Sequence, residues 1–497
     1  MALTDERVAA ASVVAAGGNR KRVVRGLGLA VLTGVLGTLA LPPFGLWPLI
    51  WVAFVPMAIA QYRVMPARWS GVAFGVGFGT YLAPQLTPGF TEAGLSPFYQ
   101  LFPVFFAAAV AALGWRSRAF HERTGYRWFV LATPLGWTAI DFLRLLSGQA
   151  ELGGTWWNPV YALHSIPSFL QPISVFSIFG LELLLLVVNY AVAALVLARL
   201  DGRRLPVRPA AAVAAVLAAW SVLSAALMGS APATTPRVRV AAVQTGTLYA
   251  KGEALQERVR RDLAQTRRAA AQGAQLVVWS ENGLRFDPNA VRTDELRSLA
   301  RETNTTLVVG YGYTRGDGRH LNELVVVFPD GRISERYGKD HPGTFAGDYS
   351  DTGGTYPVHR TAFGPLGTVI CYDLDFTDTA RQMTRNGARI LAAPSSDPRA
   401  IASTHWTHLV FRAIENRVST AKADTGSDSA IIDPWGRIVT RTENPSGHGQ
   451  VTLVADVPLG TGNTLVVRWG DWFGWVCLAG ALAFFVLRRI TARQSVA

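Results

Sequence analysis

The sequence predicts a membrane-embedded bundle of about eight α-helices joined to a layered α/β domain. Half of the 497 residues are hydrophobic and only 16% are charged, whereas an average soluble domain has about 25% charged residues. The apolar residues are concentrated in residues 26–228, while residues 237–465 have the composition of a soluble domain. The two cysteines are too few for a disulfide scaffold. The chain therefore divides into a membrane part and a soluble part.

Stretches of roughly 17–25 apolar residues are long enough to cross a bilayer as helices. We expect seven spans before the soluble domain and one after it, although Pro42, Pro43, Pro48 and Pro56 interrupt the pattern around the second span. The first stretch could instead be a cleaved signal peptide, but it has no clear cleavage site and further spans follow directly. The expected spans lie near residues 26–41, 46–62, 69–85, 98–115, 127–146, 174–198, 209–228 and 472–487.

Basic residues occur in alternate loops between these spans. NRKRVVR precedes the first span and RSRAFHERTGYR lies between the fourth and fifth, whereas the opposite loops TPGFTEAGLSP and SGQAELGGTWWNPVYALHSIP contain no Lys or Arg. The positive-inside rule then places residues 1–25 and 488–497 in the cytoplasm and residues 237–465 on the extracytoplasmic side. The net charge of +13 is explained by this orientation and by contact with anionic lipid, so no nucleic-acid partner is expected.

From Arg237 onward, short apolar runs alternate with helix-like stretches. RVRVAAVQTG, AQLVVWSENG and TTLVVGYGYT have the pattern of strands, with amphipathic helices between them. ELVVVFPDGRISERYGK has the pattern of two strands around an Asp-Gly turn, and GTVICYDLDF, ARILAAPSS and SAIIDPWGRIV add further strands. This alternation predicts a layered α/β domain. It contains no Gly-rich phosphate loop or dinucleotide fingerprint, so no nucleotide cofactor is expected.

Three polar residues are expected at the ends of strands in this domain. Glu281 ends LVVWSE, Lys339 follows ISERYG, and Cys371 ends GTVIC. Catalytic groups commonly lie at the carboxyl ends of strands in such folds. A thiolate is a strong nucleophile, a carboxylate can take its proton, and an ammonium can stabilise an anionic tetrahedral intermediate. The three would suit acyl transfer through a thioester, although each also has a structural interpretation, such as a cysteine that only fills the core.

The same segments resemble those of a known superfamily. LVVWSEN, YGKDH and VICYD, in this order, resemble the Glu–Lys–Cys segments of the nitrilase (carbon–nitrogen hydrolase) superfamily, and SAIIDPWGRIV resembles its closing strands. The preceding spans, with LGTLALPPFGLWPLIWVAFVPM, PLGWTAIDFLR and the terminal RWGDWFGW, resemble one membrane branch, the apolipoprotein N-acyltransferases. The resemblance covers nearly the whole chain and implies that the soluble domain is nitrilase-like.

The resemblance implies a two-step reaction without a metal or other cofactor. Cys371 would take an acyl chain from a phospholipid, and the α-amino group of the diacylglyceryl-cysteine of a lipoprotein would then attack the thioester. Glu281 would act as general base and acid, while Lys339 and the backbone N–H of Tyr372 would hold the oxyanion. The protein would be a monomer in the bacterial cell (inner) membrane.

The segment after Lys339 departs from the family pattern. The family usually has Lys-x-His-x-x-x-Phe-Gly-Glu, whereas this chain has KDHPGTFAGD, in which the glutamate position is Gly347 and Asp348 follows one residue later. Asp373 likewise replaces the usual glutamate two residues after Cys371. We expect Asp348 and Asp373 beside the triad. Two alternatives stay open: a membrane-bound amidase of the same superfamily, and a degenerate, non-catalytic homologue that binds lipid or scaffolds other proteins.

Other polar residues are expected to be structural. His405 and His408 are three residues apart on a predicted helix, a spacing that could suit a metal, but no third ligand is near in sequence. Asp141 and Glu182 lie within expected spans, where charged groups usually face the interior of the bundle, and Asp141 could pair with Arg144. The segment ELGGTWWNP is predicted to be an aromatic anchor at the membrane interface.

Overall fold

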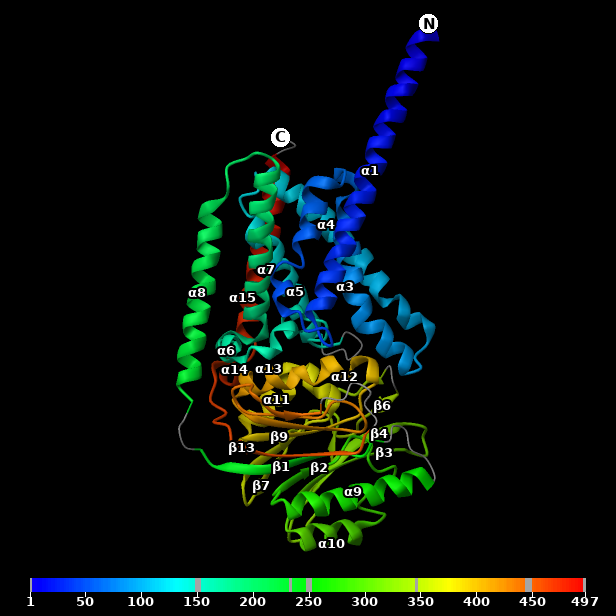
Figure 1. Cartoon of the computed structure of the whole chain (residues 1–497), viewed down its shortest axis with the longest axis vertical. Helices are drawn as coiled ribbons and strands as arrows, with labels where there is room; N and C mark the ends of the chain where they lie inside the picture. The colour runs from blue at the N-terminus through cyan, green and yellow to red at the C-terminus, as the bar shows by residue number, and fades with distance from the viewer. Residues whose placement is uncertain are drawn as a thin grey trace. The chain divides into compact units, whose positions relative to one another are not determined.

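The computed structural model describes residues 2–147, 153–231, 235–246, 253–344, 347–442 and 449–494. The chain forms two compact units, and the described strands all belong to the second (Figure 1). The first unit comprises residues 1–140, 182–219 and 476–497, and the second comprises residues 141–181 and 220–475.

The first unit is helical. It contains α1 (Ala2–Ala40), α2 (Val55–Ile59), α3 (Ser70–Glu92), α4 (Phe102–Arg123) and the short helices η1 (Trp47–Trp51), η2 (Ala60–Val64), η3 (Ala67–Trp69) and η4 (Pro97–Leu101). Four helices have residues in both units: α5 (Phe129–Leu146), α7 (Ile173–Leu200), α8 (Val207–Gly229) and α15 (Trp472–Gln494). The second unit also contains the short helices η6 (Pro159–Ser165) and α6 (Pro167–Leu170).

Among the described residues, six helices are long and apolar enough to cross a membrane. They are Asn19–Ala40, Pro97–Arg123, Phe129–Leu146, Ile173–Leu200, Val207–Gly229 and Trp472–Ile490, and each overlaps one expected span. The expected second span, residues 46–62, is not one helix, because Pro48 and Pro56 start new segments in the first turns of η1 and α2. The expected third span falls on α3, which is not among the six. The number of spans therefore stays a prediction.

Small residues bring α3 and α4 into close contact. Gly71, Gly75 and Gly79 are spaced four residues apart on α3 and therefore lie on one face. A Cβ atom at Gly75 would lie 2.5 Å from the carbonyl oxygen of Ala107, and one at Gly71 would lie 2.2 Å from that of Ala111. The two backbones thus approach each other in the manner of small-residue helix pairs in membranes.

The second unit contains two sheets. The first has the strand order β13-β1-β2-β3-β4-β5, with β6 paired to β4, and the second has the order β12-β11-β10-β9-β8-β7. The strands of the first sheet are β1 (Arg237–Gln244), β2 (Leu276–Val278), β3 (Thr306–Thr314), β4 (His320–Val327), β5 (Tyr337–Gly338), β6 (Asp348–Tyr349) and β13 (Val451–Pro458). Those of the second are β7 (Val358–Thr361), β8 (Gly364–Thr368), β9 (Ile390–Ser395), β10 (Ser419–Asp424), β11 (Ala430–Ile432) and β12 (Ile438–Arg441).

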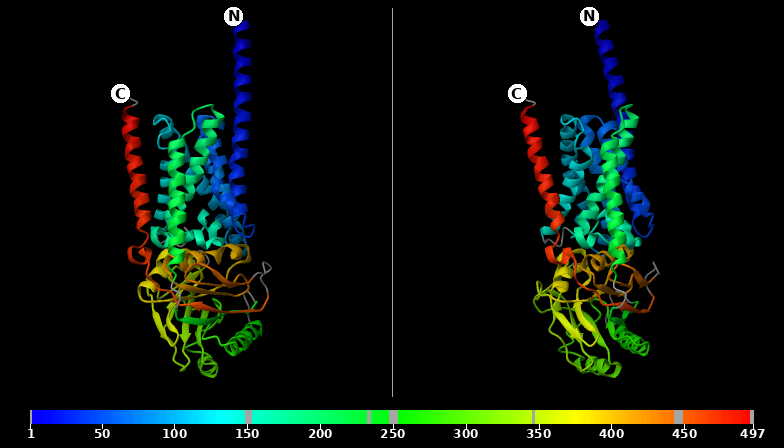
Figure 2. Two further views of the ribbon diagram at one scale, coloured as in Figure 1. Left: turned by 60° about the vertical axis from the view of Figure 1, so that its left-hand side comes forward. Right: turned by 90° about the vertical axis from the view of Figure 1, so that its left-hand side faces the viewer.

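The two sheets stack between two layers of helices, as the α/β pattern predicted. Strand β1 packs against β10, while α9 (Glu253–Ala271) and α10 (Thr293–Thr303) cover the outer face of the first sheet. Helices α11 (Thr377–Arg385) and α13 (Thr407–Asn416) cover the second sheet, and α12 (Arg399–His405) and α14 (Leu465–Trp469) flank them (Figure 2). The central strands β1, β2 and β3 are parallel to one another, as are β8, β9 and β10. Their carboxyl ends can therefore gather polar groups from distant parts of the sequence.

The core between the first sheet and its helices is apolar. Trp279 is fully buried in it, and the Trp279 indole N–H donates to Thr266 Oγ1 of α9 over 2.9 Å. Valines of β2, β3 and β4 and apolar residues of α9 and α10 complete the cluster. This packing fixes the strands from which the polar residues of the candidate site extend.

Candidate active site

Cys371 lies at a sharp turn that follows the second sheet's β8. The strand ends at Thr368, and Cys371 begins the short helix η8 (Cys371–Asp375) with a φ angle of 45°. A residue with a side chain rarely adopts this left-handed conformation, which costs free energy and persists only where the surrounding structure enforces it. Cys371 is partly exposed in this turn.

Asp373 holds the Cys371 turn together. Its carboxylate accepts hydrogen bonds from the backbone N–H of Ile370, the backbone N–H of His341 and the hydroxyl of Tyr337, each over 2.8 Å. Burial raises the pKa of Asp373 to about 6, although the neighbouring His341 opposes the shift. The structure therefore places this predicted residue directly behind the Cys371 turn, where it supports the backbone.

Lys339 lies between two carboxylates. Its Nζ atom is 2.9 Å from Glu281 Oε1 and 2.9 Å from Asp348 Oδ2. Asn322 of β4 donates to the same two oxygens, over 2.6 Å to Glu281 and 3.0 Å to Asp348. Glu281 is 3% exposed and Lys339 is 4% exposed, so the ion pairs are shielded from water. Burial lowers the pKa of Lys339, but Asp348 and Glu281 outweigh it and hold the pKa well above its ordinary value.

The position of Asp348 answers the question raised by the altered segment. The family's glutamate position falls on Gly347, yet Asp348 at the start of β6 reaches the lysine. Phe345, which also fits the family pattern, lies outside the described residues. A carboxylate is therefore present beside Lys339 although the motif is shifted by one residue.

Cys371 is electrostatically coupled to both triad partners. Burial raises the pKa of its thiol well above the ordinary value, and the negative charges of Glu281 and Asp397 raise it further. The positive charges of Lys339 and Lys422 lower it. Glu281, Lys339 and Cys371 thus act on one another within one site. At neutral pH the resting thiol is protonated and needs a base to become a nucleophile.

A second group of charged side chains, around other strands of the second sheet, also contacts the thiol. The Cys371 thiol donates to Asp397 Oδ1 over 3.4 Å, and the same oxygen is 2.8 Å from His405 Nδ1. Lys422 of β10 places its Nζ 2.9 Å from Asp397 Oδ2 and 2.7 Å from Asp424 Oδ2. Burial raises the pKa of Asp397, but His405 and Lys422 outweigh it and hold that pKa well below its ordinary value.

The sequence analysis did not identify Asn322, Asp397 or Lys422. The sequence offered a signal for two of them. Lys422 is a charged residue within the segment STAKAD, and Asp397 lies in SSDP directly after the run ILAAP. Asn322 gives no such signal, since a single amide in LNELVVVF is ordinary in a strand. These residues complete the set of side chains around the triad.

His405 and His408 do have a third neighbour in space. Asp375 lies 3.6 Å from His405 Nε2 and also contacts His408 Nδ1, and the three groups could in principle hold a metal. Burial lowers the pKa of His408 to about 4, and the positive charge of Arg412 contributes to this shift. Because Arg412 is buried beside these groups, its positive charge disfavours a cation there. Contacts of His405 and His408 with carboxylates account for the geometry, and a metal-free protein stays our prediction.

The segment between α5 and α6 lies within the same unit and corrects one expectation. Trp156 and Trp157 are 7% and 5% exposed, so the predicted interfacial anchor is wrong: both rings are buried in protein. Trp157 lies under the Arg144 guanidinium at 3.9 Å, and Arg144 also pairs with Asp141 over 3.2 Å, which confirms that expected pair. Tyr161 stacks on the ring of His408 at 3.8 Å.

Comparisons with known proteins match both parts of the chain. Residues 33–191 match the family model of the apolipoprotein N-acyltransferase N-terminal domain, and residues 239–464 match the carbon–nitrogen hydrolase model. The apolipoprotein N-acyltransferase of Geobacter metallireducens is 26% identical, with 91% of this chain and 93% of the relative aligned. That of Gloeobacter violaceus is 28% identical, with 94% of each chain aligned.

Two further matches each cover less than half of the chain. The omega-amidase of Xenopus tropicalis is 27% identical over 222 residues, which are 38% of this chain and 79% of the amidase. A solved structure of an amidase from Nesterenkonia sp. aligns with 45% of this chain and 91% of its own at 22% identity, with a TM-score of 0.38.

Proposed function

Because the chain belongs to the apolipoprotein N-acyltransferases, a membrane branch of the carbon–nitrogen hydrolases, we propose that it N-acylates lipoproteins. In this reaction an acyl chain passes from a membrane phospholipid to the α-amino group of the diacylglyceryl-cysteine of a lipoprotein. The observation that carries the proposal is the match of both the helical part and the α/β domain in one chain. The omega-amidase match covers only the smaller share of the chain.

In the first step Glu281 takes the proton of the Cys371 thiol, and the sulfur attacks the ester carbonyl of the phospholipid. The negative charge that develops on the carbonyl oxygen is stabilised by the Lys339 ammonium and by the backbone N–H of Tyr372. When the tetrahedral intermediate collapses, the C–O bond breaks and Glu281 gives its proton to the leaving lysophospholipid alcohol. The acyl chain is then held on Cys371 as a thioester.

In the second step the lipoprotein's α-amino group attacks the thioester carbonyl. Glu281 accepts a proton from the amine, the C–S bond breaks, and the thiol of Cys371 is restored as the amide forms. Asn322 and Asp348 hold Lys339 and Glu281 in position through the hydrogen bonds and the ion pair described above. Asp373 supports the Cys371 turn.

Both substrates carry acyl chains, so the reaction requires a membrane. We propose that residues 26–228 form the transmembrane domain and that residues 472–487 form a last span. Residues 237–465 would be the catalytic domain on the extracytoplasmic side of the bacterial inner membrane, with residues 1–25 and 488–497 in the cytoplasm. The alternating basic loops support this orientation.

The second candidate is a membrane-bound amidase, and the omega-amidase similarity is the observation that favours it. The two functions share the thioester and differ in whether an amine or water resolves it. A non-catalytic homologue is the third alternative. The charged contacts of Glu281, Lys339 and Cys371 argue against that alternative, because a site without catalysis gains nothing from burying them.

Intact mass spectrometry of the purified protein incubated with phospholipid tests the proposal. Wild-type protein should gain one acyl chain that hydroxylamine removes, and a Cys371→Ser variant should not. Cys477→Ser is the matched control, because Cys477 is the other cysteine and is buried elsewhere, and it should still be acylated.

A diacylated lipopeptide added to the acyl-enzyme then separates the candidates. Transfer of the chain to the lipopeptide amine supports N-acyltransfer, whereas release of free fatty acid alone favours the hydrolase. If wild-type protein gains no acyl chain from any of several phospholipids, phospholipid is not the donor and the proposed first step is wrong.

A further inference from the structure

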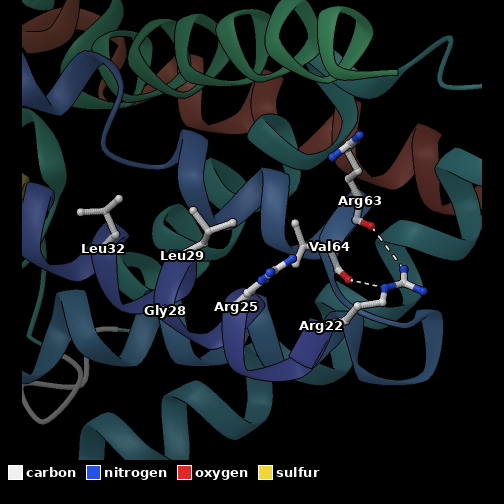
Figure 3. A pocket seen from close by; sticks show the side chains of 7 residues that line it. All are labelled: Arg22, Arg25, Gly28, Leu29, Leu32, Arg63 and Val64. Atoms are coloured by element: carbon white, nitrogen blue, oxygen red, sulfur yellow. Dashed lines mark hydrogen bonds between the residues drawn. The ribbon is translucent and has the colours of Figure 1, made fainter. Parts of the chain in front are cut away.

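A groove in the first unit lies beside the beginning of the first membrane-spanning helix. It has a volume of about 640 Å³ and lies between α1 and the end of η2 (Figure 3). Its lining consists of Arg22, Arg25, Gly28, Leu29, Leu32, Arg63 and Val64. None of these residues belongs to the candidate active site, so acyl transfer does not account for the groove.

The groove has a charged end and an apolar end. Arg22, Arg25, Leu29 and Leu32 are spaced three or four residues apart and therefore follow one face of α1. Figure 3 shows Arg22 and Arg25 extending toward Val64, with Leu29 and Leu32 further along the helix. From residue 22 to residue 32 the helix rises about 15 Å, which is roughly half the thickness of a bilayer's hydrocarbon core. The stripe thus has the length and polarity of one lipid in one leaflet.

Two of the three arginines are already bound within the protein. Arg22 donates from Nε to the carbonyl oxygen of Val64 over 3.0 Å, and Arg63 pairs with Asp201 over 2.7 Å. Arg25 makes no hydrogen bond or ion pair with the residues that the structure describes. Its guanidinium is therefore a cation available to an external anion, with five N–H donors in the geometry that binds phosphate oxygens.

We propose that this groove binds an anionic phospholipid, with its phosphate group on Arg25 and an acyl chain along Leu29 and Leu32. An anionic ligand is inferred from charge complementarity, because basic pockets between helices at the membrane interface bind anionic head groups. The apolar half of the groove favours a lipid over a free anion, since Leu32 is 40% exposed and gains by contact with an acyl chain. The site goes beyond the proposed acyl transfer and serves to hold α1 in an anionic leaflet.

Native mass spectrometry of the full-length protein, titrated in detergent with phosphatidylglycerol or with phosphatidylcholine, tests the site. Arg25→Gln should weaken retention of phosphatidylglycerol roughly fivefold, as expected for the loss of one cation near an anionic lipid. Arg20→Gln is the matched control, because Arg20 is an exposed arginine on the same helix that does not line the groove. It should bind phosphatidylglycerol like the wild type.

A second variant tests the apolar half without removing a charge. A Cβ atom at Gly28 would meet no described atom within 4 Å, so Gly28→Leu adds an apolar side chain to the lining of the groove without a clash at its Cβ. The variant should retain less phosphatidylglycerol. Its melting temperature should not fall, because leucine favours a helix more than glycine does.

Three results would overturn the proposal. One is equal retention of phosphatidylcholine and phosphatidylglycerol by the wild type. Another is an Arg25→Gln variant that binds like Arg20→Gln. The third is displacement of phosphatidylglycerol by inorganic phosphate at equal concentration, which would assign the groove to a free anion. Failure of the acyl-transfer assay would leave these three measurements unaffected.

Discussion

Cys371 interacts with two separate groups of charged side chains. One is formed by Glu281, Lys339 and Asp348, and the other by Asp397, His405 and Lys422. The thiol donates a hydrogen bond to Asp397, so this bond must break before Glu281 can take the thiol proton in the proposed first step. Because His405 and Lys422 stabilise Asp397 as an anion, Asp397 is a weak base and does not take that proton itself.

The first prediction concerns the charge on Asp397. Asp397→Asn should shift the pH profile of Cys371 alkylation to lower pH, because the negative charge that raises the thiol's pKa is removed. Iodoacetamide rates measured between pH 6 and 10, values that bracket the ordinary cysteine pKa of about 8.5, give the profile. A Cys477→Ala background leaves one thiol to react.

Asp351→Asn is the control for Asp397→Asn, because Asp351 is an exposed acid that pairs with Arg315 on the surface. Its alkylation profile should match that of the parent. A profile for Asp397→Asn that is unchanged, or displaced to higher pH, contradicts the assignment. Melting curves show whether the variant is folded, since His405 and Lys422 lose a buried partner.

The second prediction concerns Asp348, which compensates for the shifted motif. Asp348→Asn should slow formation of the acyl-enzyme about tenfold or more, equivalent to about 1.4 kcal/mol of transition-state stabilisation, because Lys339 loses one of its two carboxylates. Asp348→Glu should recover part of the rate, since the charge is kept. Single-turnover acylation followed by mass spectrometry measures both variants, and equal rates for Asp348→Asn and wild type would remove Asp348 from the mechanism.

At the scale of the secondary structure, the carboxyl ends of strands could be predicted from the sequence. The side-chain partners on neighbouring strands could not. Glu281 and Cys371 follow apolar runs that are visible in the sequence, whereas Lys339 follows ISERYG. Asn322 reaches Glu281 and Asp348 only because β4 pairs with β3, β5 and β6 in a fixed register. Register depends on the pairing of whole strands and on turn geometry, so it cannot be read from the sequence neighbours of a single residue such as Asn322.

The membrane helices show a similar division. The long apolar helices at residues 129–146, 173–200 and 207–229 agree with expected spans, because an uninterrupted run of apolar residues determines such a helix. The region of residues 46–62 is as apolar but breaks into η1, α2 and η2. Its prolines fix φ and remove backbone donors, so hydropathy alone overestimates its continuity.

The third prediction tests the contact between α3 and α4. Gly75→Ala should destabilise the protein by roughly 1–3 kcal/mol, the usual cost of overpacking, because its Cβ would lie 2.5 Å from the carbonyl oxygen of Ala107. Gly136→Ala in α5 is the matched control, since a Cβ there meets no described atom within 4 Å. The control should be neutral or stabilising by up to about 1 kcal/mol, as alanine favours a helix. Melting temperatures in one detergent measure both, and equal values would contradict the close helix contact.

The fourth prediction concerns the connection that carries His341 and packs on α11. His341 Nε2 is 3.1 Å from Asp378 Oδ1, and its ring stacks on Phe376 at 3.7 Å. Burial lowers the pKa of His341, but Asp378 and other carboxylates outweigh it and raise the pKa above the ordinary value. Asp378 has a lowered pKa: burial raises it, and the bond to His341 outweighs that effect.

These directions define a pH window for the His341–Asp378 pair. The histidine's contribution is complete below its unfolded pKa of about 6.5 and is lost as pH rises through the folded pKa. The carboxylate's contribution is present above its unfolded pKa of about 3.9 and is lost as pH falls. Asp378→Asn should therefore lower the melting temperature most at about pH 5.5 and least at pH 9. A difference that does not depend on pH would contradict the pairing.

At the scale of the whole molecule, the side of the membrane on which the α/β domain lies depends on whether an odd or an even number of spans precedes it. Five of the six long apolar helices precede that domain, and seven spans were expected. Both numbers are odd, so both place the N-terminus and the domain on opposite sides. If α3 crosses but residues 46–62 do not, six crossings precede the domain and the two lie on the same side. The basic loops favour the odd count.

The fifth prediction tests this count with single cysteines in a Cys371→Ser, Cys477→Ser background. Lys21→Cys and Arg204→Cys should react with a membrane-impermeant maleimide only after spheroplasts are permeabilised, because both lie in expected cytoplasmic segments. Asp294→Cys, at a position whose side chain is 97% exposed on the α/β domain, should react in intact spheroplasts. Labelling of Lys21→Cys together with Asp294→Cys would indicate an even number of crossings. The domain would then lie on the same side as the N-terminus, and the expected odd number of crossings before it would be wrong.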